Sequence, residues 1–159
     1  MRVFIGVGSN LGDRLGNIEQ ARSVLEKETG VRALCVSPIY ETEPVGGPPQ
    51  GKYLNAVWEF ETELEPEKLM DVLSSVEGRL GRQRDRQGKN APRVIDLDIL
   101  AYGNEIVERS DLMIPHPRLH ERWFVLKPFS DLAPDWIHPK FGRTIRDLLE
   151  EINENYPQP

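Results

Sequence analysis

Cysteine is nearly missing from this sequence: Cys35 is the one cysteine in 159 residues. No disulfide can therefore form within the chain, and since Cys35 falls in a predicted strand we expect it to be a buried apolar side chain rather than a nucleophile. The chain also lacks an apolar run of about 18 residues, which a membrane helix needs, and its N-terminal run is too short for a signal peptide. We expect a cytoplasmic protein with no membrane partner.

Positive charge is also scarce, because 20 Lys and Arg face 26 Asp and Glu and the formal net charge is −6. This balance argues against a general nucleic-acid-binding protein, so any anion site must be local. The stretch 79–93 is the exception, with Arg79, Arg82, Arg84, Arg86, Lys89 and Arg93 against a single acid, Asp85. A solvated basic loop remains an alternative interpretation of this stretch.

Internal repeats, low-complexity segments and domain boundaries are missing too. A chain of this length is large enough to bury a core without disulfides or structural metals. We therefore expect residues 1–159 to form one domain, and we expect a monomer.

The residues Pro92 to Leu100 form the most informative stretch that is present. Alternation predicts a strand with Ile95, Leu97 and Ile99 on one face and with Asp96 and Asp98 together on the other. Two carboxylates two positions apart on one strand lie about 7 Å from each other and repel unless a cation lies between them. With arginines just upstream, this pattern favours a Mg²⁺–nucleotide site. A strand with a simply hydrated polar face is the alternative.

Hydrophobic periodicity predicts an α+β fold. The apolar patterns place strands at 2–8, 31–40, 53–62 and 92–100, and helices between Asp13 and Gly30 and between Pro66 and Gly81. This order is that of the split β-α-β, ferredoxin-like antiparallel sheet with helices packed on it. Beyond it we expect a short strand at 106–107, a helical segment within 115–124 and a C-terminal helix at 144–152, which together make a helical extension.

Three further features concern function. Residues 43–51 hold three prolines and three glycines, which is typical of a binding loop or lid. Glu77 stands near the C-terminal end of a predicted helix, where the helix dipole disfavours an acid, so either it has a partner such as an arginine or, the favoured interpretation, it is exposed. The turn Gly6-x-Gly8-x-x-x-Gly12 does not fit a dinucleotide fingerprint, because its last interval is one residue too long.

Several short motifs together resemble the 6-hydroxymethyl-7,8-dihydropterin pyrophosphokinase family of folate biosynthesis, over roughly residues 1 to 130. They are Gly8-Ser9-Asn10, Tyr53-Leu54-Asn55-Ala56, Gly81-Arg82-x-Arg84, Ala91-Pro92-Arg93-x-x-Asp96-Leu97-Asp98-Ile99-Leu100, and Pro115-His116-Pro117-Arg118 with Arg122 and Phe124.

The resemblance implies a pyrophosphoryl transferase that uses ATP and Mg²⁺, with two ions, and releases AMP. The metal ligands would be Asp96 and Asp98, and the catalytic residues would be these two acids with Arg82 and Arg93. On the nucleotide side it implies Glu77, Arg84, the backbone near Ile99, His116 and Arg122. On the pterin side it implies Asn10, Thr42, Val45, Gly46, Tyr53, Asn55 and Phe124.

Two other functions stay open from the residues alone. A Mg²⁺-dependent nucleotide hydrolase could use the same acids and arginines with water as the acceptor. A non-catalytic ferredoxin-like module could bind RNA on its sheet, but it would need aromatic side chains along the central strands, where the sequence has Val3, Ile5 and Val7.

Overall fold

The computed structural model describes residues 1–45, 48–81 and 92–155. Within these ranges its elements are β1 (Arg2–Ser9), α1 (Arg14–Glu26), β2 (Val31–Val36), β3 (Tyr40–Thr42), β4 (Tyr53–Thr62), α2 (Pro66–Arg79), β5 (Asp96–Tyr102), β6 (Val107–Arg109), β7 (Leu112–Ile114), the 3₁₀ turn η2 (Leu119–Glu121), α3 (Trp123–Leu132) and α4 (Ile145–Asn155).

The main sheet has the strand order β2-β4-β1-β5, and β3 pairs with β4 as well. Every neighbouring pair in it is antiparallel. This order, with α1 and α2 as the crossover helices, is that of the ferredoxin-like arrangement, so the predicted fold class is confirmed.

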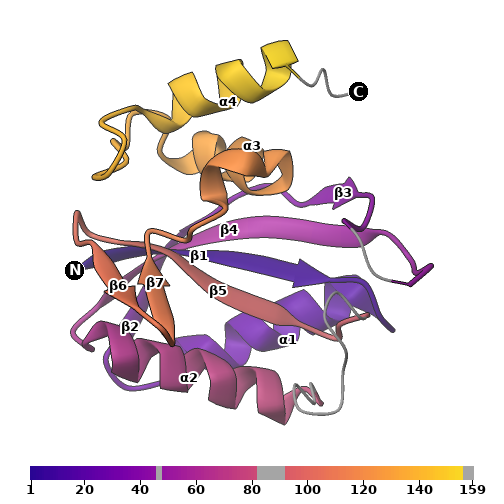
Figure 1. Cartoon of the computed structure of the whole chain (residues 1–159). Coiled ribbons are helices and arrows are strands. Elements are labelled where there is room, and N and C mark those ends of the chain that lie inside the picture. Colours follow the sequence, from indigo (N-terminus) through magenta and orange to yellow (C-terminus); the bar gives the residue numbers. More distant parts are fainter. Residues whose placement is uncertain (46–47, 82–91, 156–159) are drawn as a thin grey trace.

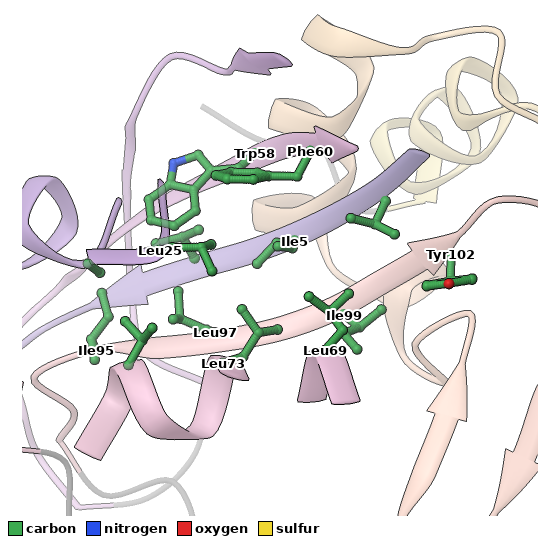
Figure 2. Close-up of a cluster of buried hydrophobic side chains, with 14 of the residues drawn as sticks. Ile5, Leu25, Trp58, Phe60, Leu69, Leu73, Ile95, Leu97, Ile99 and Tyr102 are labelled. Carbon is green, nitrogen blue, oxygen red and sulfur yellow. The ribbon is translucent and has the colours of Figure 1, made fainter. Parts of the chain in front are cut away.

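The sheet lies between two layers of helices: α1 and α2 cover one face, and α3 and α4 lie over the other (Figure 1). The first layer encloses the larger core, in which Ile5, Leu25, Trp58, Phe60 and Leu97 are buried (Figure 2). The second layer is built on an aromatic stack in which the Phe4 and Phe129 rings lie 4.5 Å apart and the Phe129 and Trp136 rings 5.3 Å apart. Burial of apolar surface on both sides makes β1 a central strand, as its two apolar faces predicted.

The helix ends follow the predicted signals. The Asp13 carboxylate accepts a hydrogen bond from the Gly16 N–H at the start of α1, Pro66 is the first residue of α2, and the Thr144 hydroxyl accepts one from the Asp147 N–H at the start of α4. Gly30 and Gly81 have φ angles of 90° and 97°, which other residues rarely adopt.

The segment predicted as one strand at 31–40 is two strands in the structure. Residues 37–39 separate β2 from β3, because Pro38 among them cannot donate a ladder hydrogen bond. Cys35 is exposed, so its predicted burial was wrong. The physical reason is that β2 is the edge strand of the sheet and its side chains from Leu34 to Val36 are exposed on both faces.

The region after β5 differs more from the prediction. The expected short strand is Val107–Arg109, which pairs with an unpredicted strand, Leu112–Ile114, in a separate two-stranded sheet. The expected helical segment is the turn η2, and it leads into the longer helix α3. In the part of the chain that the structure describes, no helix is long and apolar enough to cross a membrane.

Candidate active site

The face of the sheet below α3 is apolar at one end of the strands and carries glycines and acids at the other. On β1, Phe4 is followed on the same face by Gly6 and Gly8, whereas on β5 Leu100 is preceded by Asp98 and Asp96. The register places Gly6 opposite Asp98 and Gly8 opposite Asp96. The apolar half packs against α3 and α4, and the glycine half lies under a cleft.

The described lining of this cleft comes from segments far apart in the chain. It consists of Gly6, Val7, Gly8, Thr42, Glu43, Val45, Tyr53, Asn55, Ala56, Arg93, Asp96, Asp98, Leu100, His116, Arg122, Phe124 and Val125.

Glycine at two positions keeps the floor of the cleft open. A Cβ atom at residue 8 would lie 3.1 Å from Asn55 Oδ1 and 3.3 Å from Tyr53 Cδ1, and one at residue 6 would lie 3.1 Å from Leu100 Cδ2. These distances are tighter than ordinary van der Waals contact. The backbone of β1 can therefore come close to a ligand only because these two positions carry no side chain.

One side of the cleft is aromatic and amide-bearing. Tyr53 and Asn55 project from the start of β4, and Phe124 projects from the first turn of α3, where the Arg122 guanidinium lies 5.5 Å from its ring centre. The Asn55 amide donates a 2.5 Å hydrogen bond to the Thr42 hydroxyl. This bond uses the Asn55 nitrogen and leaves the Asn55 oxygen, which lies beside Gly8, as a hydrogen-bond acceptor.

The other side of the cleft is charged. Asp96 and Asp98 stand on β5, and Arg93 precedes this strand. Burial and the neighbouring Arg118 lower the pKa of Arg122, while Asp98, Asp96 and Glu121 act in the opposite direction. Arg122 is therefore within electrostatic reach of both acids.

His116 is held as a neutral imidazole beside these charges. Burial, followed by repulsion from Arg122, lowers its pKa to about 4, against an opposing influence from Asp96. Its Nδ1 atom accepts a hydrogen bond from the Arg118 N–H at 3.1 Å, so the neutral ring carries its proton on Nε2. The His116 N–H in turn donates to the Leu100 carbonyl at 3.0 Å, which fixes this segment to β5. His116 thus offers an uncharged N–H donor at neutral pH.

The chemistry of the cleft suits a flat heterocycle on one side and a polyanion with a divalent cation on the other. Aromatic rings and a polar edge bind the first, and arginines with paired carboxylates suit the second. Among residues 1–45, 48–81 and 92–155, no group of three or more His, Cys, Asp and Glu side chains could hold a metal ion. A cation between Asp96 and Asp98 would therefore need further ligands from a substrate or from water.

Comparison with known proteins identifies the family of the chain. The sequence model of the family described as 7,8-dihydro-6-hydroxymethylpterin-pyrophosphokinase matches residues 4–134. The chain belongs to this family.

The curated relatives include enzymes of similar length and proteins that are much longer than this chain. The chain is 42% identical over 131 residues to the 2-amino-4-hydroxy-6-hydroxymethyldihydropteridine pyrophosphokinase of Bacillus subtilis, covering 82% of this chain and 77% of that protein. The chain is 39% identical to the enzyme of the same name from Methylorubrum extorquens, and the match covers 96% of this chain and 94% of that enzyme. The chain is also 40% identical to part of the Schizosaccharomyces pombe folic acid synthesis protein fol1. This match covers 94% of the chain but only 20% of fol1. It spans about a fifth of such fungal relatives.

Solved structures agree in fold. A crystal structure titled as HPPK-DHPS in complex with substrates superposes with a TM-score of 0.73 at 16% identity, over 98% of this chain and 44% of that one. A Plasmodium falciparum HPPK-DHPS structure with pteroate superposes with a TM-score of 0.77 at 14% identity, over 99% of this chain and 44% of that one.

The structure brings most of the residues predicted from the pyrophosphokinase resemblance into one cleft. Ten of them line it: Thr42, Val45, Tyr53, Asn55, Arg93, Asp96, Asp98, His116, Arg122 and Phe124. Three lie outside the described residues: Gly46, Arg82 and Arg84. Their roles, like those of the ten, stay predictions.

The remaining three predicted residues lie outside the described lining of the cleft. The side chain of Ile99 is in the core on the opposite face of the sheet. Glu77 is only 2% exposed, so the favoured interpretation as an exposed glutamate was wrong; the Leu97 N–H on β5 donates to its carboxylate at 3.0 Å. Asn10 is also buried, and it bonds to segments on either side of the cleft.

Glu43, which lines the cleft, is the first residue of the predicted binding loop 43–51, whereas sequence reasoning gave no role in the site to Leu100 and Val125, which line it too. Alternation along β5 could have found Leu100, because it shares a face with Asp96 and Asp98. No signal in the sequence marks Val125, whose position depends on where α3 packs.

Proposed function

We propose that the chain transfers the pyrophosphoryl group of ATP to the hydroxymethyl group of 6-hydroxymethyl-7,8-dihydropterin in folate biosynthesis. The observation that carries the proposal is the cleft whose glycine floor separates an aromatic, amide-bearing side from a side with two carboxylates and Arg93. In this reaction the hydroxymethyl oxygen bonds to the β-phosphorus, the bond from that phosphorus to the α,β-bridging oxygen breaks, and AMP leaves. The hydroxyl proton passes to solvent.

Asp96 and Asp98 fit Mg²⁺, because carboxylates are hard oxygen ligands and Mg²⁺ usually takes one or two of them and completes its shell with phosphates and water. We propose two ions between these acids and the triphosphate. Bound there, Mg²⁺ would offset phosphate charge and acidify the hydroxymethyl group.

Cationic side chains hold the phosphates in this proposal. Arg93 and Arg122 line the cleft and supply guanidinium forks there. The proposal adds Arg82 and Arg84, which lie outside the described residues, as two further phosphate-binding side chains. Positive charge that is already in place needs no reorganisation when negative charge spreads in the transition state. His116 donates from Nε2 to the nucleotide; with a pKa of about 4 it is a poor base at neutral pH.

The pterin lies on the aromatic side in this proposal. Tyr53 and Phe124 stack on its two faces, and Asn55, oriented by Thr42, accepts a hydrogen bond from its edge. Val45 lines this side of the cleft, and the proposal adds the backbone of Gly46, which lies outside the described residues. The position of Arg122 against the Phe124 ring keeps the pterin and nucleotide sides adjacent.

The deciding experiment incubates the protein with ATP and Mg²⁺, with and without the hydroxymethyl pterin, and follows AMP. The proposal expects AMP only when pterin is present. Phosphate release without pterin would indicate the hydrolase instead, and no turnover under either condition would favour a non-catalytic binding module. The predicted cytoplasmic location and monomeric state stay predictions.

A further inference from the structure

Tyr40 connects the short strand β3 to the helix α3. Its hydroxyl donates to Asp131 Oδ2 at 2.5 Å, and its ring meets the Trp123 ring edge-on, with the ring centres 5.8 Å apart. The Lys127 ammonium lies 6.0 Å from the centre of the same Tyr40 ring and 3.3 Å from Asp131 Oδ1. Since β3 lies beside α3, this one tyrosine contacts the helix near both of its ends (Figure 1).

The three residues that Tyr40 contacts form one stripe of α3. Trp123, Lys127 and Asp131 follow one another at intervals of four, and residues four apart lie on the same face of a helix. Because the contacts act at both ends of this stripe, they restrict rotation of α3 about its axis as well as its distance from β3. Burial, followed by the hydrogen bond to Asp131 and the charge of that acid, raises the pKa of Tyr40 to about 12. The hydroxyl therefore stays a donor at neutral pH.

The first turn of α3 depends on such contacts for its position. Among the described residues, no side chain caps the N-terminus of this helix. The stack of Phe129 on Phe4 holds the second half of α3 to the sheet. On the side of the first turn that faces β3, Trp123 packs against Tyr40. Phe124 is the next residue along the helix, so any rotation or shift of Trp123 also moves the Phe124 ring.

This contact bears on the aromatic side of the cleft. Phe124 and Tyr53 both line that side, Phe124 from α3 and Tyr53 from β4. The register places Tyr40 opposite Asn55, which shares β4 with Tyr53 and also lines the cleft. The contact between Tyr40 and Trp123 therefore helps to set how far the Phe124 ring lies from the side chains of β4.

We propose that Tyr40 is a positioning residue for the pterin: by holding α3 against β3, it fixes the Phe124 ring at the distance from Tyr53 that a flat heterocycle needs. This inference rests on the proposed function, in which these two rings stack on the pterin. Tyr40 is not among the described residues that line the cleft, so it acts through Phe124 and not by contact with the substrate.

The test is a double-mutant cycle on pterin affinity. Tyr40→Phe removes only the hydroxyl, and Asp131→Ala removes the acceptor of the same hydrogen bond, so each variant tests the bond if the other does not fold. Each change is made alone and together with Phe124→Ala. Calorimetry measures the affinity for 6-hydroxymethylpterin, with Mg²⁺ and a saturating ATP analogue whose α,β-bridging oxygen is replaced by methylene, so that no transfer occurs.

The matched control is Tyr102→Phe. The Tyr102 hydroxyl donates to the Leu64 carbonyl at 2.5 Å, so this variant loses a hydrogen bond of the same length from the same sheet. Tyr102 is not among the described residues that line the cleft. It therefore shows whether lost stability alone weakens pterin binding. All variants are compared at a temperature well below their unfolding midpoints.

The expected losses follow from the strength of one stacked ring. Stacking on Phe124 is worth up to about tenfold in affinity, and an effect that acts through this ring cannot exceed the effect of removing it. We therefore expect pterin binding to weaken about tenfold in Phe124→Ala and about threefold in Tyr40→Phe and Asp131→Ala. In the Phe124→Ala background we expect neither change to weaken binding further, because coupled residues are not additive. Tyr102→Phe should bind pterin as the wild-type chain does.

Three results overturn the inference. The first is wild-type pterin affinity in Tyr40→Phe and Asp131→Ala. The second is an equal loss from these changes with and without the Phe124 ring, because Tyr40 would then act independently of Phe124. The third is the same loss in Tyr102→Phe, because lower stability alone would then explain the effect. If the wild-type chain binds no pterin at all, the proposed function itself fails.

Discussion

Asp96 and Asp98 make the most direct prediction at the level of single residues. Replacing either with Asn keeps the shape of the side chain but removes a charged oxygen ligand for Mg²⁺. Since a metal supplies several kcal/mol of transition-state stabilisation, we expect turnover of ATP with pterin to fall by at least about a hundredfold.

The measurement is AMP formation at saturating substrates, with circular dichroism to check the fold. Asp71→Asn is the matched control, because Asp71 is an exposed acid on α2 and is not among the described residues that line the cleft. Near-normal turnover in both Asp96→Asn and Asp98→Asn would exclude the metal role of this pair.

Gly8 gives a second prediction at this scale, for the pterin side. The added Cβ of Gly8→Ala presses on Asn55 Oδ1 at 3.1 Å and on the Tyr53 ring at 3.3 Å, so both side chains must move. A misplaced stacking ring and edge acceptor together are worth about 1–2 kcal/mol, and we expect pterin affinity to fall about tenfold.

Fluorescence titration with 6-hydroxymethylpterin measures this loss. Gly78→Ala is the control, because a Cβ there meets no atom within 4 Å and alanine favours the α2 helix. Pterin affinity equal to that of wild type in Gly8→Ala would show that the floor of the cleft tolerates a side chain.

At the scale of elements, the C-terminal end of α2 is fixed to β5 through Glu77. This carboxylate is buried and accepts from the Leu97 N–H, one residue from each of the two acids of the cleft. In Glu77→Ala the Leu97 N–H loses this acceptor, so we expect the free energy of unfolding to fall by about 1–3 kcal/mol. Urea denaturation measures the change.

Glu77→Gln separates the two roles that Glu77 can have. The glutamine keeps a neutral acceptor for the Leu97 N–H, so we expect it to retain most of the stability that alanine loses. If Glu77→Gln weakens binding of a non-hydrolysable ATP analogue, measured by calorimetry with Mg²⁺, while stability stays high, the predicted nucleotide role of Glu77 gains support. If it behaves as wild type in both measurements, that role is lost.

The elements also differ in how far the sequence predicts them. β1, β4, α1, α2 and α4 have clear periodicity and end signals, and the structure has them close to their predicted bounds. Helix α3 has no side-chain cap at its start and carries Pro128 within it, so local signals for it are weak. Its position depends on the long-range stack of Phe129 on Phe4, which no local pattern reveals.

The site residues, like the elements, were predictable where local pattern decides their position and not where long-range packing does. Asp96, Asp98, Tyr53 and Asn55 lie on regular strands whose alternation sets the direction of each side chain, and all four line the cleft. The environment of Glu77 could not be predicted, because it depends on how the end of α2 packs against β5 and not on position within the helix.

At the scale of the whole molecule, both layers of helices depend on the one sheet, and the segment that connects α3 to α4 folds around His138. This side chain is 2% exposed; its ring stacks on Phe141 at 4.1 Å, and its Nδ1 accepts from the Lys140 and Phe141 N–H groups. Burial, with His120 and Lys140 nearby, lowers its pKa to about 4. A neutral His138 is therefore part of the folded state.

The stability of the whole chain should consequently depend on pH. Since the pKa of His138 is about 4 in the folded chain and about 6.5 when unfolded, the unfolded chain binds more protons between these values. The stabilisation is fully present above pH 6.5 and is lost as the pH falls toward 4, by at most about 3 kcal/mol. His116, with a similarly lowered pKa, adds a change of the same sign.

Urea denaturation measures this dependence at about pH 7.5, 6.5, 5.5 and 4.5, which span the range in which histidine titrates. Carboxylates also titrate near pH 4, so the comparison that isolates His138 is with His138→Asn, which keeps an acceptor but does not titrate. We expect the variant to be less stable than wild type at pH 7.5 and to lose less stability on acidification, so that the two curves converge near pH 4.5. Parallel curves would mean that His138 titrates equally in the folded and unfolded chain, so that burial of its neutral ring does not contribute to the pH dependence of stability.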